Sequence, residues 1–316
     1  MSRLTQAAAG RYAPPAARRE LVAVSADGAR LHVEEHGDPD APPVVLAHGW
    51  TCSTAFWAAP IRDLAADHRV IAYDQRGHGR TPATSSYSTT ALADDLAAVL
   101  RAALAPGERA VLAGHSMGGM TIMAAAGRPE LDEHAAAVLL CSTGSSRLAA
   151  EARVVPLRPG RLRTRLTRAL LGSRAPLGPI TPPARQVLKY ATMGPGSAPD
   201  KVEACARIVH ACPTAVRHGW SRVLADLDVD ARLAALTAPT AVLGGTADRL
   251  SPIVHARRLA AALPRCVGLT ELAGMGHMTP VEAPEAVAGA IRDLARRYLA
   301  DHPQETRQQQ QEERTP

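Results

Sequence analysis

The sequence is poor in aromatic residues and in lysine. Phe, Trp and Tyr make up 3% of the 316 residues, with a single Phe, and only two of the 36 basic residues are lysines. At this length a chain with 46% hydrophobic residues still buries a large core. We therefore expect a folded protein whose core consists mainly of aliphatic side chains.

The positive net charge is not accompanied by a nucleic-acid-binding motif. The chain has a formal charge of +6 and a pI near 9.4, and nearly all its cations are arginines in a sequence rich in Ala, Pro and Gly. That composition indicates high-GC coding. No basic segment is interleaved with aromatic residues of the kind that stack on bases, so we expect no nucleic-acid partner.

Cysteine motifs and long apolar runs are missing as well. The five cysteines include no C-x-x-C pair and no Cys/His spacing typical of a metal site, which predicts reduced core residues, no bound metal and no cofactor. No stretch reaches about 18 uninterrupted apolar residues, so no transmembrane segment is expected. Residues 1–19 carry four arginines and no apolar h-region, which argues against a signal peptide and favours a cytoplasmic location. The sequence leaves the oligomeric state open.

Short apolar runs alternate with helical patterns along most of the chain. This alternation predicts an α/β protein with a mostly parallel, buried sheet. The strand-like runs are 31–35, 44–47, 70–73, 110–113, 136–141, 240–244 and 266–272. Helices fit at 54–66, 89–104, 117–126, 252–263 and 284–299.

One segment, 114–118, reads Gly-His-Ser-Met-Gly and stands between an apolar run and a helical stretch. A serine at a sharp strand-to-helix turn needs small neighbours, which Gly114 and Gly118 supply, because the backbone there is strained and closely approached. Such a turn holds the Ser116 hydroxyl above the sheet edge, at the positive end of the helix. This context predicts that Ser116 is a catalytic nucleophile.

An acid and a base follow Ser116 in chain order. Asp248 comes shortly after the run 240–244, and His277 follows the run 266–272, so both leave the sheet on the side where Ser116 stands. A serine hydroxyl is a weak nucleophile at neutral pH and needs a histidine to take its proton, and a carboxylate fixes the tautomer of that histidine. We therefore predict a catalytic triad of Ser116, Asp248 and His277.

Both partners have structural alternatives. Any of the 12 histidines could be a core or surface residue, but His277 lies in a Gly-rich turn after the last expected strand. Asp248 could instead be a turn residue or a helix cap. We interpret it as the triad acid because Ser251 and Pro252 already supply a cap and a first-turn proline for the next helix.

The motifs and their order resemble those of the α/β-hydrolases over about residues 20–300. The resemblance implies a mostly parallel eight-stranded sheet flanked by helices, with a helical cap inserted after strand 6. The segment 48–50 (His-Gly-Trp) is similar to the family's oxyanion loop, which implies that the backbone N–H groups of Trp50 and Met117 form the oxyanion hole. Some members place the acid after the preceding strand, but the segment that follows 136–141 here offers no carboxylate.

The alternating pattern breaks between residues 147 and 236. The resemblance implies that 147–236 is a helical cap that covers the site, while 20–146 and 237–300 form the hydrolase core. Residues 1–19 are expected to form a flexible N-terminal segment. Residues 301–316 are polar and low in complexity, which predicts a disordered tail.

Two further segments are conspicuous. Residues 161–171 are basic and amphipathic, with Leu162, Leu166 and Leu170 four residues apart. A solvated basic face explains this pattern, and contact with an anionic substrate or a lipid surface is the alternative. Residues 74–81 are similar to a family segment that shapes a turn, and we interpret them as structural.

These features predict a serine hydrolase that cleaves carboxylic esters of a small or medium apolar substrate through an acyl-enzyme on Ser116. Lactonases, thioesterases, carbon–carbon bond hydrolases and perhydrolases share the triad and stay open. Epoxide hydrolases and haloalkane dehalogenases have Asp as the nucleophile, so Ser116 argues against both. A ligand receptor or accessory protein that keeps the hydrolase fold is the alternative from a different class.

Overall fold

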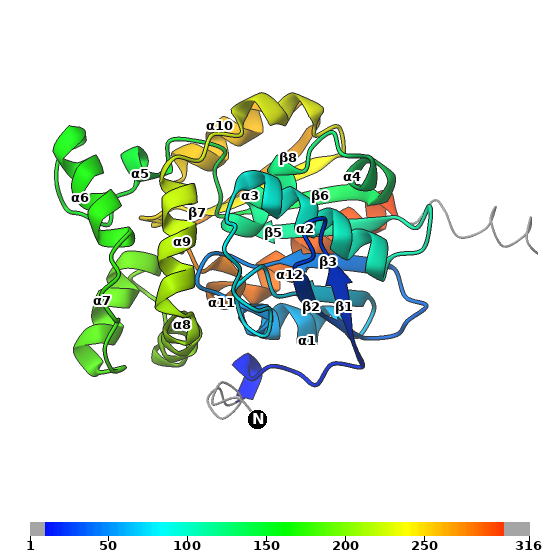
Figure 1. Cartoon of the computed structure of the whole chain (residues 1–316), viewed down its shortest axis with the longest axis horizontal. Helices are drawn as coiled ribbons and strands as arrows, with labels where there is room; N and C mark the ends of the chain where they lie inside the picture. Colours follow the sequence, from blue (N-terminus) through cyan, green and yellow to red (C-terminus); the bar gives the residue numbers. More distant parts are fainter. Residues whose placement is uncertain (1–9, 300–316) are drawn as a thin grey trace, which may run out of the picture.

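A single mixed sheet runs through the molecule, which a computed structural model describes for residues 10–299 (Figure 1). Its order is β1-β2-β4-β3-β5-β6-β7-β8, with β1–β2 and β2–β4 antiparallel and every other pair parallel. This confirms the mostly parallel eight-stranded sheet. The strands are β1 (Arg19–Val24), β2 (Arg30–His36), β3 (Pro43–Ala47), β4 (Arg69–Tyr73), β5 (Ala110–His115), β6 (Ala135–Cys141), β7 (Thr240–Gly245) and β8 (Cys266–Leu272).

The seven strand-like runs of the sequence did not include β1. This strand lies at the edge of the sheet, and Ala23 is its one buried residue, so it has no continuous apolar run. The inner strands β3, β5 and β6 are buried along their whole length. Their sequences are apolar except for His115 at the end of β5, because both faces of the sheet are covered.

Helices pack on both faces of the sheet. Side chains of β3 alternate between two apolar cores, with Val45 and Ala47 in the core under α2 and α3, and Val44 and Leu46 in the core under α1 and α12. The α-helices outside the segment between β6 and β7 are α1 (Ala58–Leu64), α2 (Thr89–Ala103), α3 (Met117–Ala124), α4 (Pro129–His134), α10 (Val254–Ala262), α11 (Thr279–Glu282) and α12 (Pro284–Tyr298). Short 3-10 helices are η1 (Gly10–Tyr12), η2 (Thr54–Trp57) and η3 (Asp230–Ala235).

Five α-helices and η3 lie between β6 and β7, and we call this part of the chain the helical insertion. The five α-helices are α5 (Leu148–Glu151), α6 (Arg161–Leu171), α7 (Pro182–Thr192), α8 (Pro199–Ala211) and α9 (Thr214–Ala225). In Figure 1 they form the green layer on the left, with α6 and α7 farthest from the sheet. The chain therefore leaves the sheet after β6 and returns to it at β7.

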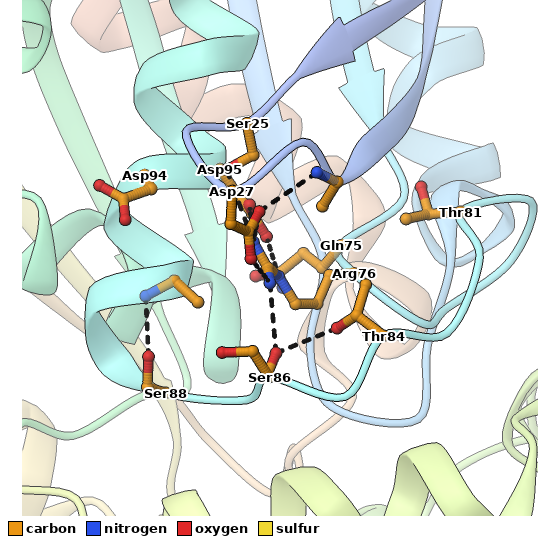
Figure 2. A network of polar contacts seen from close by, with 12 residues as sticks. Ser25, Asp27, Gln75, Arg76, Thr81, Thr84, Ser86, Ser88, Asp94 and Asp95 are labelled. Carbon is orange, nitrogen blue, oxygen red and sulfur yellow. Dashed lines mark hydrogen bonds and ion pairs between the residues drawn. The ribbon is translucent and has the colours of Figure 1, made fainter.

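The segment 74–81 is held by an ion-pair network around the buried side chain of Arg76 (Figure 2). The guanidinium donates from Nε and Nη2 to the carboxylate of Asp95 on α2, at 2.8 and 2.6 Å, and from Nη1 to Asp27 at 2.6 Å. A fully buried guanidinium is costly unless its donors are paired, and here they are shared between two carboxylates. The network joins the β1–β2 turn to the loop after β4 and to α2.

The structure describes only part of the two segments predicted at the chain ends. Residues 1–9 and 300–316 lie outside the described residues, so the predicted disordered tail falls outside as well. Within the predicted N-terminal segment, Arg11 of η1 is ion-paired with Asp63 and Glu285. Between residues 10 and 299 no helix is both long and apolar enough to span a membrane.

Candidate active site

Ser116 occupies the turn between β5 and α3 in a strained conformation. Its φ of 51° and ψ of −116° lie outside the regions that non-glycine residues normally adopt. The turn depends on two glycines, because a Cβ on Gly114 would lie 2.5 Å from the carbonyl carbon of Gly118, and a Cβ on Gly118 would lie 2.1 Å from the carbonyl oxygen of Ala47. The strand therefore meets the helix at a distance that only glycine permits.

Asp248 and His277 meet at the carboxyl ends of β7 and β8. Nδ1 of His277 lies 2.8 Å from Oδ2 of Asp248, and both side chains are buried. Oδ1 of Asp248 accepts the backbone N–H groups of Leu250 and Ser251, at 2.8 and 2.9 Å. The loop after β7 thus fixes the carboxylate and leaves its second oxygen for the imidazole.

Ser251 corrects one argument from the sequence. The sequence predicts that Ser251 caps the next helix, but α10 begins at Val254 and its N-cap residue is Ile253. The Ser251 hydroxyl instead lies 2.8 Å from Oδ2 of Asp248, 3.1 Å from Nδ1 of His277 and 2.8 Å from the carbonyl oxygen of Ser142. A serine three residues after the acid carries no sequence signal for this position.

The two backbone groups expected to bind an oxyanion lie at the turns after β3 and β5. Met117 is the first residue of α3, and Trp50 follows β3 in a loop beside the Ser116 turn. A Cβ on the neighbouring Gly49 would lie 3.2 Å from Cβ of Ser116, which shows how closely this loop approaches the turn. Within the described residues, neither N–H has a hydrogen-bond acceptor in the protein.

Two buried histidines hold the Trp50 loop in place. Nε2 of His48 accepts the backbone N–H of Gln75 at 3.0 Å, and Nε2 of His78 accepts that of Thr51 at 3.1 Å. Burial lowers the pKa of His48 to about 3 and that of His78 to about 4, because desolvation disfavours the imidazolium. Both rings therefore stay neutral and accept hydrogen bonds at neutral pH.

His115, directly before Ser116, supports the catalytic histidine candidate. Its Nε2 lies 2.8 Å from the carbonyl oxygen of His277, which can only accept, so this nitrogen carries the proton. Burial lowers the pKa of His115 well below its ordinary value, and the nearby His277 lowers it further. The two rings are 4.9 Å apart. His115 is therefore a neutral ring that fixes the backbone of His277.

Glu282 is a residue that sequence reasoning missed. This buried carboxylate in α11 accepts the backbone N–H groups on either side of His277, those of Gly276 at 3.1 Å and Met278 at 3.0 Å. It also accepts from the insertion, at 2.7 Å from both the backbone nitrogen of Gly194 and the hydroxyl of Ser197. In the sequence it is one acid among 30 and has no distinguishing pattern.

A cavity of about 480 Å³ lies between the sheet and the helical insertion. Ser116 and His277 both line it, together with His115 and Trp50. Most of its other wall residues are aliphatic and come from the insertion, among them Leu148, Val154, Leu188 and Val209. Trp57 and Trp220 do not line the cavity and are fully buried in the two apolar cores.

One group of metal-ligating side chains lies close together within the described residues, and it is remote from this cavity. Glu20, His32 and Glu34 lie on the β1–β2 hairpin. Their polar atoms already have partners in the protein, since Glu20 pairs with Arg80, and Nε2 of His32 lies 3.0 Å from Oε1 of Glu34. The group therefore serves the hairpin.

The comparisons with known proteins agree with this architecture. A sequence profile of the alpha/beta hydrolase family matches residues 44–290. The proposed carbamate hydrolase RutD of Variovorax paradoxus (strain S110) is 33% identical over 277 residues, which cover 85% of this chain and 97% of that protein.

Solved structures with the same fold include two esterases. RhEst1 of Rhodococcus sp. ECU1013 matches with a TM-score of 0.74 and 25% identity, over 88% of this chain and 99% of its own. EaEST of Exiguobacterium antarcticum also has a TM-score of 0.74, with 18% identity over 88% of this chain and 100% of its own, and shows the fold alone.

Proposed function

Because the chain belongs to the alpha/beta hydrolase family, we propose that it is a serine hydrolase that cleaves carboxylic esters of small or medium apolar substrates. One observation carries the proposal. A strained turn holds Ser116 in the wall of an aliphatic cavity that His277 also lines, with Asp248 2.8 Å behind the imidazole. Nucleophile, base and orienting acid are the parts that acyl transfer requires.

The proton path follows from the tautomer. A carboxylate oxygen can only accept, so Nδ1 of His277 donates to Asp248 and leaves the Nε2 lone pair for the Ser116 hydroxyl. As Oγ attacks the ester carbonyl, Nε2 takes its proton, and Asp248 stabilises the imidazolium that forms. The imidazolium then protonates the leaving alcohol. Water, deprotonated by the same nitrogen, releases the acid from Ser116.

The tetrahedral intermediate develops a negative oxygen that needs donors already in place. The N–H groups of Trp50 and Met117 fill this role in the proposal, since neither has an acceptor within the described part of the chain. One such donor contributes about 3–4 kcal/mol in other enzymes. The neutral rings of His48 and His78 anchor the loop that carries Trp50.

We assign the helical insertion the role of a cap, which residues 147–236 supply. It contributes aliphatic side chains to the cavity, and the carbonyl oxygen of Thr192 at the end of α7 accepts the backbone N–H of His277. The cavity therefore favours an apolar acyl or alcohol group. Residues 20–146 and 237–300 then form the hydrolase core that carries the triad.

Carbamate hydrolysis is a second candidate. It is favoured by the relative from Variovorax paradoxus, whose name carries that activity and of which this chain covers 97%. A carbamate carbonyl is attacked in the same way as an ester carbonyl, so the same residues serve both reactions. The aliphatic cavity is the reason to place esters first.

The test combines labelling with a substrate panel. The purified protein should react with a fluorophosphonate probe at Ser116 and hydrolyse p-nitrophenyl esters, with rates that vary with acyl chain length. Thioesters, lactones and alkyl carbamates in the same panel separate the alternatives. Ser116→Ala should lose labelling and at least about 10⁴-fold in kcat, since the triad acts as a unit. A wild-type protein that neither labels nor turns over any member would point instead to a receptor with this fold.

A further inference from the structure

A long segment of the insertion contains no acidic residue. Between residues 152 and 199 the sequence has eight arginines and one lysine, and no Asp or Glu. Arg168 pairs with Asp226 and Arg185 with Glu203, both beyond this segment. Arg158, Arg161 and Arg165 are exposed and have no carboxylate within ion-pair distance in the described residues. The outer face of the insertion is therefore strongly positive.

Helix α6 in this segment turns its polar face towards the protein and its apolar face towards solvent. It buries Arg163 and Thr167 and exposes Leu162 by 65%, Leu166 by 42% and Leu170 by 57%. Surface helices normally bury their apolar stripe and expose the polar one. The buried guanidinium of Arg163 donates one hydrogen bond from Nη2 to the carbonyl oxygen of Ala150, at 2.8 Å. The leucine stripe predicted from the sequence thus points away from the protein.

The stripe is part of a larger apolar surface, which we call the leucine face. Seven of the ten large hydrophobic side chains exposed in the described residues fall between 157 and 190. They are Leu157, Leu162, Leu166, Leu170, Leu177, Val187 and Tyr190. Figure 1 shows α6 and α7, which carry most of them, at the outer edge of the molecule. Single exposed leucines are common, but a gathered set marks an interaction surface.

The leucine face is continuous with the cavity that holds Ser116. Leu170, Leu177 and Val187 are exposed, and all three also line the cavity wall. They therefore form its mouth. A molecule that enters the cavity from this side passes between the leucine face and Ser116.

We propose that the leucine face docks on an anionic lipid surface. Its leucines insert among the acyl chains while Arg158, Arg161, Arg165 and Arg174 contact phosphates at the headgroup level. Apolar side chains beside unpaired arginines fit a lipid surface better than a nucleic acid, which offers no acyl layer. The entry of substrate from that surface into the mouth rests on the proposed function, whereas docking itself does not.

Vesicle flotation of the full-length protein tests docking. Wild type should float with phosphatidylglycerol vesicles at low salt, far less with phosphatidylcholine vesicles, and lose binding at high salt. The double variants L162S/L166S and R161Q/R165Q should each bind the anionic vesicles about 10-fold more weakly, since the first removes two of the seven apolar side chains of the leucine face and the second removes two of its four arginines. These four residues do not line the cavity, so hydrolysis of a soluble short-chain ester should stay within about 2-fold and report correct folding.

Matched controls lie at the other end of the molecule. V22S/V24S removes two exposed apolar side chains from β1, and R30Q/R297Q removes two exposed charges outside the insertion, on β2 and α12. Both should float like wild type.

The proposal is overturned if wild type does not bind anionic vesicles, or if L162S/L166S binds them as strongly as wild type. It is also overturned if that variant only abolishes self-association seen by sedimentation velocity, because a second copy would then be the occupant. Flotation without any ester hydrolysis would leave docking supported and remove the proposed function.

Discussion

The carboxylate of Glu282 lies 2.7 Å from the backbone nitrogen of Gly194, so one buried side chain ties the insertion to the turn of the proposed catalytic histidine. The same carboxylate accepts the N–H groups of Gly276 and Met278, which flank His277. The backbone N–H of His277 in turn donates to the carbonyl oxygen of Thr192 in the insertion, at 2.8 Å. Any shift of this part of the insertion therefore acts on His277.

Glu282→Gln should lower both activity and stability. In either orientation the new amide NH₂ would face a backbone N–H, that of Gly194 or that of Met278, so at least one buried donor loses its acceptor, at a cost of about 1–3 kcal/mol. We expect the free energy of unfolding to fall by that amount and kcat to fall about 10-fold or more, because His277 loses its fixed position. Ser197→Ala is the matched control, since it removes one of the same hydrogen bonds and leaves those at His277 intact. Equal kcat values for the two variants would contradict a positioning role for Glu282.

Asp248→Asn should leave the protein folded and lower kcat by about 10³- to 10⁴-fold. The Asn oxygen can still accept from Leu250 and Ser251, which preserves the loop. Its NH₂ would face Nδ1 of His277 and force the proton onto Nε2, which then cannot accept the Ser116 proton. Steady-state kinetics beside circular dichroism measures this. Asp230→Asn, an exposed carboxylate in η3, is the control and should stay within about 2-fold of wild type.

Gly118→Ala should disrupt the turn that carries Ser116, whereas a Gly→Ala change elsewhere in the chain should increase stability. An added Cβ would lie 2.1 Å from the carbonyl oxygen of Ala47, an atom of a buried central strand that has no room to shift. We expect a loss of several kcal/mol in stability, or a displaced Ser116 that no longer reacts with fluorophosphonate. Gly289→Ala in α12 meets no atom within 4 Å and should add about 0.5–1 kcal/mol through helix propensity. Urea titrations of both variants provide the comparison.

Acid should destabilise the fold before its carboxylates are fully protonated. The pKa values of His48 and His78 fall from an ordinary 6.5 to about 3 and about 4, so their contribution to stability is present above pH 6.5 and is lost as pH falls towards 4. The pKa of His115 is lowered in the same direction. Burial raises the pKa of Asp74 to about 6. Between about pH 6 and 3.8 the folded protein therefore binds one proton at Asp74 that the unfolded chain does not bind, and this cancels the destabilising effect of one histidine.

With three histidines against one aspartate, the free energy of unfolding should fall by about 1–3 kcal/mol per pH unit between pH 6 and 4. Urea unfolding at graded pH measures the slope. His78→Gln keeps a side chain that can accept from Thr51 and donate to the Arg76 carbonyl, and it removes one titrating group. Its slope should be lower by about 1.4 kcal/mol per pH unit. A slope that is the same in both proteins would mean that His78 does not titrate on unfolding.

The sequence by itself determined the parallel core of the sheet and the order of the candidate site residues. Fully apolar strands such as β3 and β6 indicate burial on both faces, and the glycines around Ser116 indicate a turn that only they permit. Asp248 and His277 followed from their place after β7 and β8, because the carboxyl ends of parallel strands share one edge. The family profile over residues 44–290 confirms the fold that this pattern implied.

Only the tertiary structure decided which polar side chains support the site. Glu282 and Ser251 act through partners far along the chain, so no local pattern marks them. The sequence does not reveal the edge strand β1, because only one of its residues is buried and its sequence therefore shows neither an apolar run nor a regular alternation. The orientation of α6 was also beyond the sequence. A leucine stripe at four-residue spacing shows that a helix is amphipathic, but which side faces the protein depends on what the rest of the fold places beside it.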